Sequence, residues 1–163
     1  MAAKLNAMRL LEQHHIPYEA VTYDDAETFH SAEDVADILG VPPHIVYKTL
    51  VVEPAGGGKP ALALVASDRS LDLKKLAAAM GTKKVSMAAH KDAERLTGLK
   101  VGGISPLALV HKNWTVYLDQ PATALEHILI SAGQRGTQVR VPTAALVSLL
   151  RARVAEISAP TGT

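Results

Sequence analysis

VYKTLVV, residues 46–52, reads as a β-strand because branched and aromatic side chains fill most of it. Side chains alternate across a strand, so Lys48 falls on the same face as Leu50 and Val52. An ammonium group among core side chains costs free energy unless it is paired or borders a wet cavity. Lys48 is therefore either a charge that protects an exposed sheet edge or a cation that a site requires.

Signals for other strands and helices surround this stretch. PALALVA (60–66) predicts a second strand, and EPAGGGK (53–59) between the two predicts a hairpin tip. Ser31 and Asp34 have the spacing of a capping box, and the helix they begin should end at Gly40. Further helices are expected over about 5–14, from Ser70 to Met80, from about Met87 to Thr97 and from Pro142 onward. Further strands are expected in YEAVTY (18–23), WTVYLD (114–119), HILIS (127–131) and TQVRV (137–141).

These elements define a fold class. Strands and helices are mixed without a regular βαβ alternation, which predicts an α+β fold with a mostly antiparallel, barrel-like sheet surrounded by helices. The chain has 163 residues, of which 48% are hydrophobic and 20% charged, as in ordinary soluble domains. We expect residues 1–163 to form a single domain.

The composition excludes several kinds of chemistry. Without cysteine, the chain has no disulfide, no thiolate metal site and no cysteine nucleophile. The histidines lack metal-ligand spacing, and no phosphate loop, dinucleotide fingerprint or serine-nucleophile motif is found, so neither metal nor cofactor is expected. No segment is apolar for the length of a membrane helix, and the start lacks a secretory pattern. A cytoplasmic location is the resulting expectation.

Charge is unevenly distributed along the chain. A formal net charge of +1 gives no whole-chain argument for nucleic acid. The segment 71–101 is nevertheless basic, and it is either a solvated face or a stripe that tracks phosphates. Its charged residues are Lys74, Lys75, Lys83, Lys84, Lys91, Arg95 and Lys100 against Asp72, Asp92 and Glu94.

Two glycine-rich turns accompany the lysine. GLKVGGISP (98–106) contains Gly102 and Gly103, whose backbone can approach a ligand closely and present bare N–H groups. SAGQRG (131–136) follows a predicted strand. Each turn alone is consistent with a tight loop. Together with an inward lysine, they predict a pocket suited to an ester or phosphate oxygen.

VYKTLVV, LDLKKLAAAMGTKKVSMA, GGISPL and SAGQRG, in this order, resemble the YbaK/EbsC family of aminoacyl-tRNA deacylases. The free-standing Cys-tRNA(Pro) deacylase type is the most similar, and the fold also occurs as the editing domain of bacterial prolyl-tRNA synthetases. The likeness extends from IPYEAVTYD to LLRARVAEI. It implies a hydrolase that acts on the acceptor end of tRNA without metal or cofactor, with prolyl-tRNA synthetase as a partner in trans.

The resemblance also implies roles for individual residues. Lys48 matches the key lysine of the family, and Gly102 and Gly103 match its catalytic loop. Gln138 departs from the family, which has an acidic residue there, and Ala108 stands where a glycine often follows ISPL. The positions that match substrate-binding residues are Tyr23, Thr49, Pro106, Ser131 and Gly133.

The implied chemistry needs no protein nucleophile. In the family, the cysteinyl thiol attacks its own ester carbonyl, which releases tRNA and leaves a cyclic thioester that then opens. Cys-tRNA(Pro) is the expected substrate, with Cys-tRNA(Cys) as an additional one and little discrimination between tRNA bodies. Two alternatives stay open: deacylation of Ala-tRNA(Pro) or another aminoacyl ester, and a tRNA-binding module without turnover.

Overall fold

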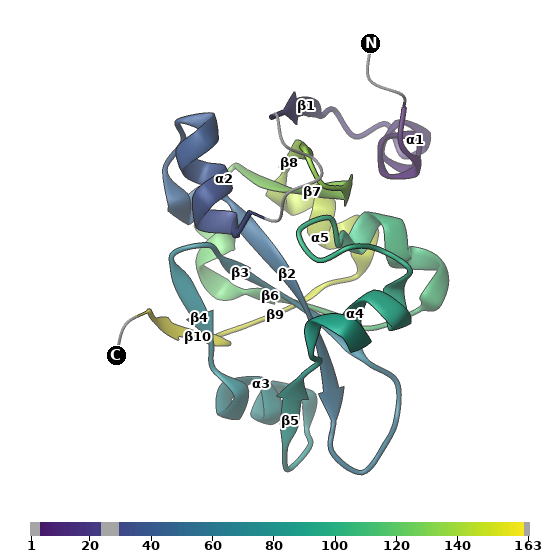
Figure 1. Cartoon of the computed structure of the whole chain (residues 1–163), viewed down its shortest axis with the longest axis vertical. Helices are drawn as coiled ribbons and strands as arrows, with labels where there is room; N and C mark the ends of the chain where they lie inside the picture. The colour runs from purple at the N-terminus through teal and green to yellow at the C-terminus, as the bar shows by residue number, and fades with distance from the viewer. Residues whose placement is uncertain (1–3, 24–29, 162–163) are drawn as a thin grey trace.

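A computed structural model describes residues 4–23 and 30–161 (Figure 1). Its α-helices are α1 (Asn6–Gln13), α2 (Ala32–Leu39), α3 (Leu73–Met80), α4 (His90–Thr97) and α5 (Thr143–Leu150). Its strands are β1 (Glu19–Thr22), β2 (Tyr47–Pro54), β3 (Ala61–Ala66), β4 (Arg69–Leu71), β5 (Val85–Met87), β6 (Val116–Asp119), β7 (His127–Gln134), β8 (Thr137–Pro142), β9 (Arg153–Ala155) and β10 (Ser158–Pro160). The 3-10 helices are η1 (Pro43–Ile45), η2 (Pro106–Lys112) and η3 (Gln120–Ala124).

The strands form three sheets. The largest has the order β5-β2-β3-β6-β9, the second β1-β8-β7, and β10 pairs with β4. Strand pairs are antiparallel except β3–β6 and β6–β9. An isolated bridge between Val46 and Leu129 joins the two larger sheets, and helices lie around them (Figure 1). The predicted α+β class with a mostly antiparallel sheet is confirmed.

Both faces of the central strands are covered. Tyr47 and Val51 of β2 pack in the larger core cluster, whereas Val52 packs with Leu76 of α3 in a second cluster. All residues of β3 are buried. This two-sided burial explains why PALALVA is continuously apolar, since only strands covered on both faces lose the polar alternation.

Local signals set the ends of several helices. The Ser31 hydroxyl accepts from the Asp34 N–H at 3.1 Å and the Asp34 carboxylate accepts from the Ser31 N–H at 3.2 Å, so the predicted capping box is confirmed. Gly40 ends α2 with φ +70°, which glycine adopts without steric cost. The hairpin tip predicted between β2 and β3 is also present.

Two predicted helix starts are wrong. Ser70 does not cap α3 but lies in β4, and the Asp72 carboxylate instead accepts from the N–H groups of Lys74 and Lys75. The next helix begins at His90 rather than near Met87, because Val85–Met87 form β5 at the edge beside β2.

A buried carboxylate fastens the C-terminal segment to the core. Asp119, at the end of β6, is 1% exposed. It accepts from the Ile157 N–H at 3.0 Å and from the Ser158 hydroxyl. Arg69 Nε donates to the same hydroxyl at 2.6 Å. One side chain therefore connects β6 with β10 and, through Arg69, with β4.

Candidate functional site

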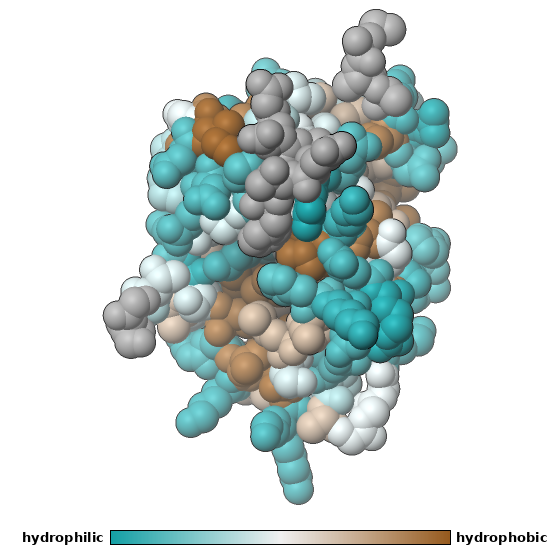
Figure 2. Space-filling view, in the orientation of Figure 1, coloured by the Kyte–Doolittle hydropathy of each residue, from teal (hydrophilic) through white to brown (hydrophobic). Residues whose placement is uncertain are grey.

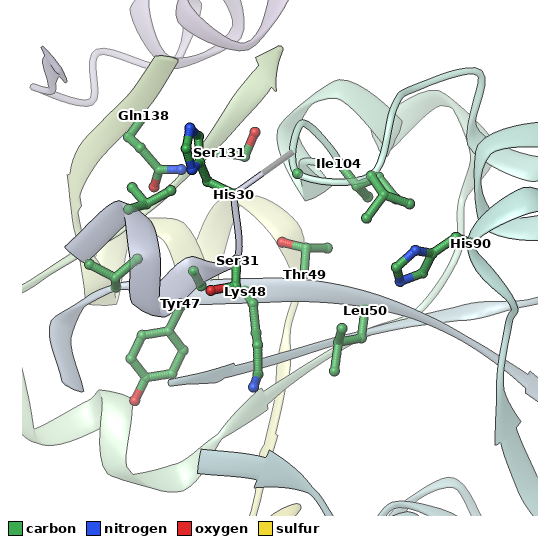
Figure 3. A pocket seen from close by; sticks show the side chains of 15 residues that line it. His30, Ser31, Tyr47, Lys48, Thr49, Leu50, His90, Ile104, Ser131 and Gln138 are labelled. Carbon is green, nitrogen blue, oxygen red and sulfur yellow. The ribbon is translucent and has the colours of Figure 1, made fainter. Parts of the chain in front are cut away.

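A pocket of about 180 Å³ lies where β2 meets β7 and β8. Its other walls are the residues before and at the start of α2, the first residue of α4, and the loop 101–104. Figure 3 shows His30, Ser131 and Gln138 on one side of the pocket and His90 on the other. The volume is below the range of pockets for drug-sized ligands, so it suits a small group such as an aminoacyl moiety.

Lys48 and Thr49 both line the pocket but extend to opposite sides of β2. Thr49 points toward the side that carries Ser131, whereas the Lys48 ammonium extends away from it (Figure 3). The alternation of side chains along a strand produces this separation. The hydroxyl therefore faces the interior of the pocket, and the ammonium stands at its border.

Lys48 is half-buried, and no hydrogen bond or ion pair of its ammonium group is found within residues 4–23 and 30–161. Burial lowers the pKa of Lys48 below its usual value, because desolvation disfavours the charged form. The carboxylates of Glu33 and Asp68 act in the opposite direction at longer range. The cation is thus held without a direct protein partner.

Thr49 Oγ1 and Gln138 Oε1 are buried atoms of pocket residues and have no hydrogen-bond partner in the described part of the chain. Gln138 is only 5% exposed. Buried polar atoms are almost always satisfied in folded proteins, because leaving one unpaired costs free energy. A polar ligand that fills the pocket would supply the missing partners.

The loop 101–104 is held firmly behind the pocket. Gly102, with φ +94°, lines the pocket. The Gly103 N–H donates to the Lys100 carbonyl at 2.8 Å, so this predicted oxyanion donor is engaged within the loop. Arg135 Nε donates to the Val101 carbonyl at 2.6 Å, which ties the loop to the turn after β7.

Close backbone packing explains the glycine at position 103. A Cβ there would lie 2.8 Å from the Arg135 backbone nitrogen and 3.0 Å from the Gln134 carbonyl carbon. Neither backbone atom can move away as a flexible side chain would. Gly103 therefore lets the loop 101–104 and the 134–135 turn touch.

Gly103→Ala is expected to lower the free energy of unfolding by about 1–3 kcal/mol, the usual cost of overpacking, and to reduce activity by displacing Gly102. Urea unfolding of both proteins measures the first effect. Gly57→Ala is the contrasting variant: it introduces backbone strain at φ +97° with no atom within 4 Å of the new Cβ, whereas the cost at Gly103 comes from packing without a positive φ. Equal stability of Gly103→Ala and the parent would contradict the packing argument.

Of the remaining predicted site residues, Ser131 lines the pocket, whereas Tyr23, Pro106 and Gly133 do not. Tyr23 packs edge-on against His30 with ring centroids 6.1 Å apart, and His30 lines the pocket. Pro106 begins η2 and borders a different cavity. Gly133 donates its N–H to the Ser131 hydroxyl at 3.2 Å. Their predicted roles in binding stay predictions.

The structure also accounts for Ala108 and adds residues that the sequence did not reveal. A Cβ at Gly133 would lie 3.2 Å from the Ala108 Cβ, so the two small residues share one contact. His30, His90 and Ile104 line the pocket without having been predicted. Isolated histidines and an isoleucine carry no motif, and only the fold brings them together.

Two kinds of feature are absent from the described residues. No cluster of histidine and carboxylate side chains within residues 4–23 and 30–161 could hold a metal ion. In the same residues, no helix is both long and apolar enough to cross a membrane.

Comparison with known proteins identifies the family. Residues 26–149 match the aminoacyl-tRNA editing domain. The chain is 41% identical over 155 residues to the "Putative Cys-tRNA(Pro)/Cys-tRNA(Cys) deacylase EbsC" of Enterococcus faecalis, covering 95% of this chain and 93% of that protein. The chain therefore belongs to the aminoacyl-tRNA editing family, and the resemblance seen in the sequence is confirmed.

Two further likenesses agree with this placement. The chain is 32% identical over 111 residues to a proline–tRNA ligase of Nitratidesulfovibrio vulgaris, covering 68% of this chain and 19% of the ligase. A solved structure described as a "putative trans-editing enzyme for prolyl tRNA synthetase" superposes with a TM-score of 0.77 over 97% of this chain and 99% of that one. At 23% identity, the second likeness establishes the fold alone.

Proposed function

We propose that this protein is a trans-editing deacylase that hydrolyses Cys-tRNA(Pro), and Cys-tRNA(Cys) as well. The observation that carries the proposal is the small pocket with two unpartnered buried polar atoms, Thr49 Oγ1 and Gln138 Oε1, in a member of the editing family. The relative from Enterococcus faecalis bears a name with these substrates. The pocket holds the aminoacyl group, and its mouth holds the terminal nucleoside.

The pocket residues take complementary roles in this proposal. The Gln138 amide oxygen accepts from the α-amino group of the ester, and the Thr49 hydroxyl donates to its carbonyl oxygen. The Gly102 backbone, which lines the pocket, lies beside the developing oxyanion, and Gly103 holds the loop in place behind it. Lys48, at the border of the pocket, binds the phosphate of the terminal nucleotide.

The substrate supplies the nucleophile. The chain contains no cysteine, so the cysteinyl sulfur of the substrate attacks its own ester carbonyl. A C–S bond forms, the C–O bond to the ribose breaks, and the released ribose oxygen takes up the thiol proton. Water then opens the cyclic thioester to free cysteine. Intramolecular attack of a well-oriented group reaches effective molarities of about 10⁵ M or more.

This chemistry gives sharp selectivity. A synthetase pocket for proline cannot strongly reject a competitor of similar size by binding alone. A site that relies on the substrate thiol spares prolyl and alanyl esters, because these lack the attacking atom. Correctly charged Pro-tRNA(Pro) would therefore not be hydrolysed, even when its prolyl group enters the same pocket.

Partner and location follow from the substrate in this proposal. Prolyl-tRNA synthetase would deliver the mischarged tRNA in trans, which the likeness to domains of proline–tRNA ligases supports. Aminoacyl-tRNA is a cytoplasmic substrate, so we place the protein there. Residues 1–163 would act as one domain, without metal or cofactor.

Cys-tRNA(Pro) and Ala-tRNA(Pro), prepared on the same tRNA, test the proposal directly. We expect rapid release of cysteine and release of alanine at no more than the spontaneous rate, because alanine has no thiol. Release of cysteine should accelerate with pH toward the usual thiol pKa of about 8.5. Rapid release of alanine would overturn the thiol mechanism. Tight tRNA binding without any release would instead indicate a binding module, which the neutral Gln138 would then explain.

A further inference from the structure

We propose that the RNA strand leaves the pocket across α4, where Lys91, Arg95 and Lys100 contact its phosphates. This surface, called the α4 face below, consists of these three residues. The inference rests on the proposed function, because it takes the aminoacyl ester to lie in the pocket. It adds the direction in which the rest of the tRNA approaches.

Opposite charges flank the pocket. On one side, α2 begins directly after the pocket residues His30 and Ser31 and carries the exposed carboxylates Glu33, Asp34 and Asp37 without any cation. A phosphate chain that crossed α2 would be repelled by all three. The potential around the mouth therefore disfavours this exit.

On the other side, the first residue of α4, His90, is exposed and lines the pocket. Lys91 and Arg95 are both exposed and stand four residues apart, which places them on one face of the helix. Lys100 is exposed in the loop that leads back to the pocket residue Gly102. Cations thus follow the pocket wall outward on this side.

The carboxylates near the α4 face do not neutralise its positive charge. Glu94 is turned toward the loop, where its carboxylate accepts from the Val101 N–H at 2.9 Å. Asp92 contacts Arg95 at 3.5 Å, but the Arg95 side chain stays 67% exposed. An exposed pair of this kind contributes little free energy, so the guanidinium is available to a phosphate.

The hydrophilic surface over α4 and the length of this helix fit a strand that continues outward from the pocket. Figure 2 shows an apolar area near the middle of this face with a strongly hydrophilic area over α4 beside it. The eight residues of α4 extend about 12 Å, the length of three or four stacked nucleotides at about 3.4 Å each. The single-stranded acceptor end has room to lie along the helix.

The test replaces the α4 face with neutral side chains: Lys91→Gln, Arg95→Gln and Lys100→Gln in one protein. The control, Arg9→Gln, Lys59→Gln and Arg140→Gln, removes the same charge from exposed residues that do not line the pocket. Each protein is assayed for kcat/KM on Cys-tRNA(Pro), for binding of uncharged tRNA, and for release of cysteine from the cysteinyl ester of adenosine.

The slope of log K for tRNA binding against log salt is negative. Loss of three phosphate contacts should make it about 2 less steep, since each contact to a single strand contributes roughly 0.7. The ratio of the parent's tRNA affinity to that of the α4 variant would then be about 20-fold larger at 50 mM salt than at 200 mM salt. The control variant should keep the parent slope, and the adenosine ester should be cleaved equally by all three proteins.

The two proposals fail differently. If tRNA binding by the α4 variant and by the control variant had equal salt slopes, the proposal that the α4 face contacts RNA phosphates would be overturned. This would hold even if the parent deacylates Cys-tRNA(Pro). Absence of deacylation by the parent, with tRNA binding that depends on the α4 face, would overturn the proposed reaction and retain the RNA surface. A loss of adenosine-ester cleavage equal to the loss on tRNA would assign these residues to the pocket itself and reject a role along the strand.

Discussion

Lys48→Ala is expected to lower kcat/KM for Cys-tRNA(Pro) by about 10²–10³-fold, the range measured when one preorganised electrostatic contact is removed from an active site. The ammonium group stands at the border of the pocket without a direct protein partner in the described residues. Its charge is therefore available to a substrate phosphate. Steady-state deacylation of parent and variant measures the effect, with Ala-tRNA(Pro) as the comparison substrate.

Lys48→Met is the matched variant, because it retains most of the side-chain length without the charge. Folding lowers the pKa of Lys48 from 10.5, so the folded state disfavours the charged form. At neutral pH, loss of the charge should therefore leave stability unchanged or raise it. Any gain should vanish as the pH rises through the folded-state pKa toward 10.5, where the parent lysine also becomes neutral.

An inactive Lys48→Met protein with an undiminished melting temperature would assign the lysine to function. Loss of stability in both variants with activity retained would instead assign the Lys48 side chain a structural role in β2. Unchanged activity and stability would show that the pocket does not use this cation.

Asp119→Ala is expected to lower the free energy of unfolding by about 3 kcal/mol, since hydrogen bonds to a charged group are worth about 1.5–3 kcal/mol each and unpaired buried donors add to the cost. The Ile157 N–H and the Ser158 hydroxyl would both lose their acceptor. For a chain of this size, the melting temperature should fall by about 6–12 °C. Urea and thermal unfolding measure both quantities.

Asp119→Asn and Asp37→Ala complete this experiment. The amide of Asp119→Asn keeps one acceptor oxygen. The free energy of unfolding of this variant should therefore lie between those of the parent and Asp119→Ala. Asp37 is exposed on α2, where loss of a carboxylate should change stability by less than about 0.5 kcal/mol. If Asp119→Ala were as mild as Asp37→Ala, the C-terminal segment would not depend on this carboxylate.

Local patterns predicted the parts of the fold that local interactions decide. The capping box at Ser31 and the hairpin after β2 use residues close in sequence, and both are present. Ser70 and Asp72 are both good helix caps, and the choice between them depends on β10, which pairs Leu71 with Ser158. A residue 87 positions away thus decides where α3 begins, and no local pattern contains that information.

The residues of the candidate site likewise fall into those that sequence motifs predicted and those that only tertiary packing places. Lys48, Thr49, Gly102 and Ser131 were singled out from motifs, and the structure brings them to one pocket. Gly103 was assigned to the same loop, but its tight contact with the 134–135 turn could not be predicted. The histidines at positions 30 and 90 belong to no motif, because their place in the pocket depends on how α2 and α4 pack on the sheet.

The bridge between Val46 and Leu129 has a consequence for how this protein could evolve. The pocket lies where two separately hydrogen-bonded sheets meet, so its width depends on side-chain packing between them rather than on either strand ladder. A substitution at this joint would change the room for an amino-acid side chain and leave every strand pair in register. Substitutions at this joint are therefore a route by which the amino-acid preference of the pocket could change without altered strand pairing.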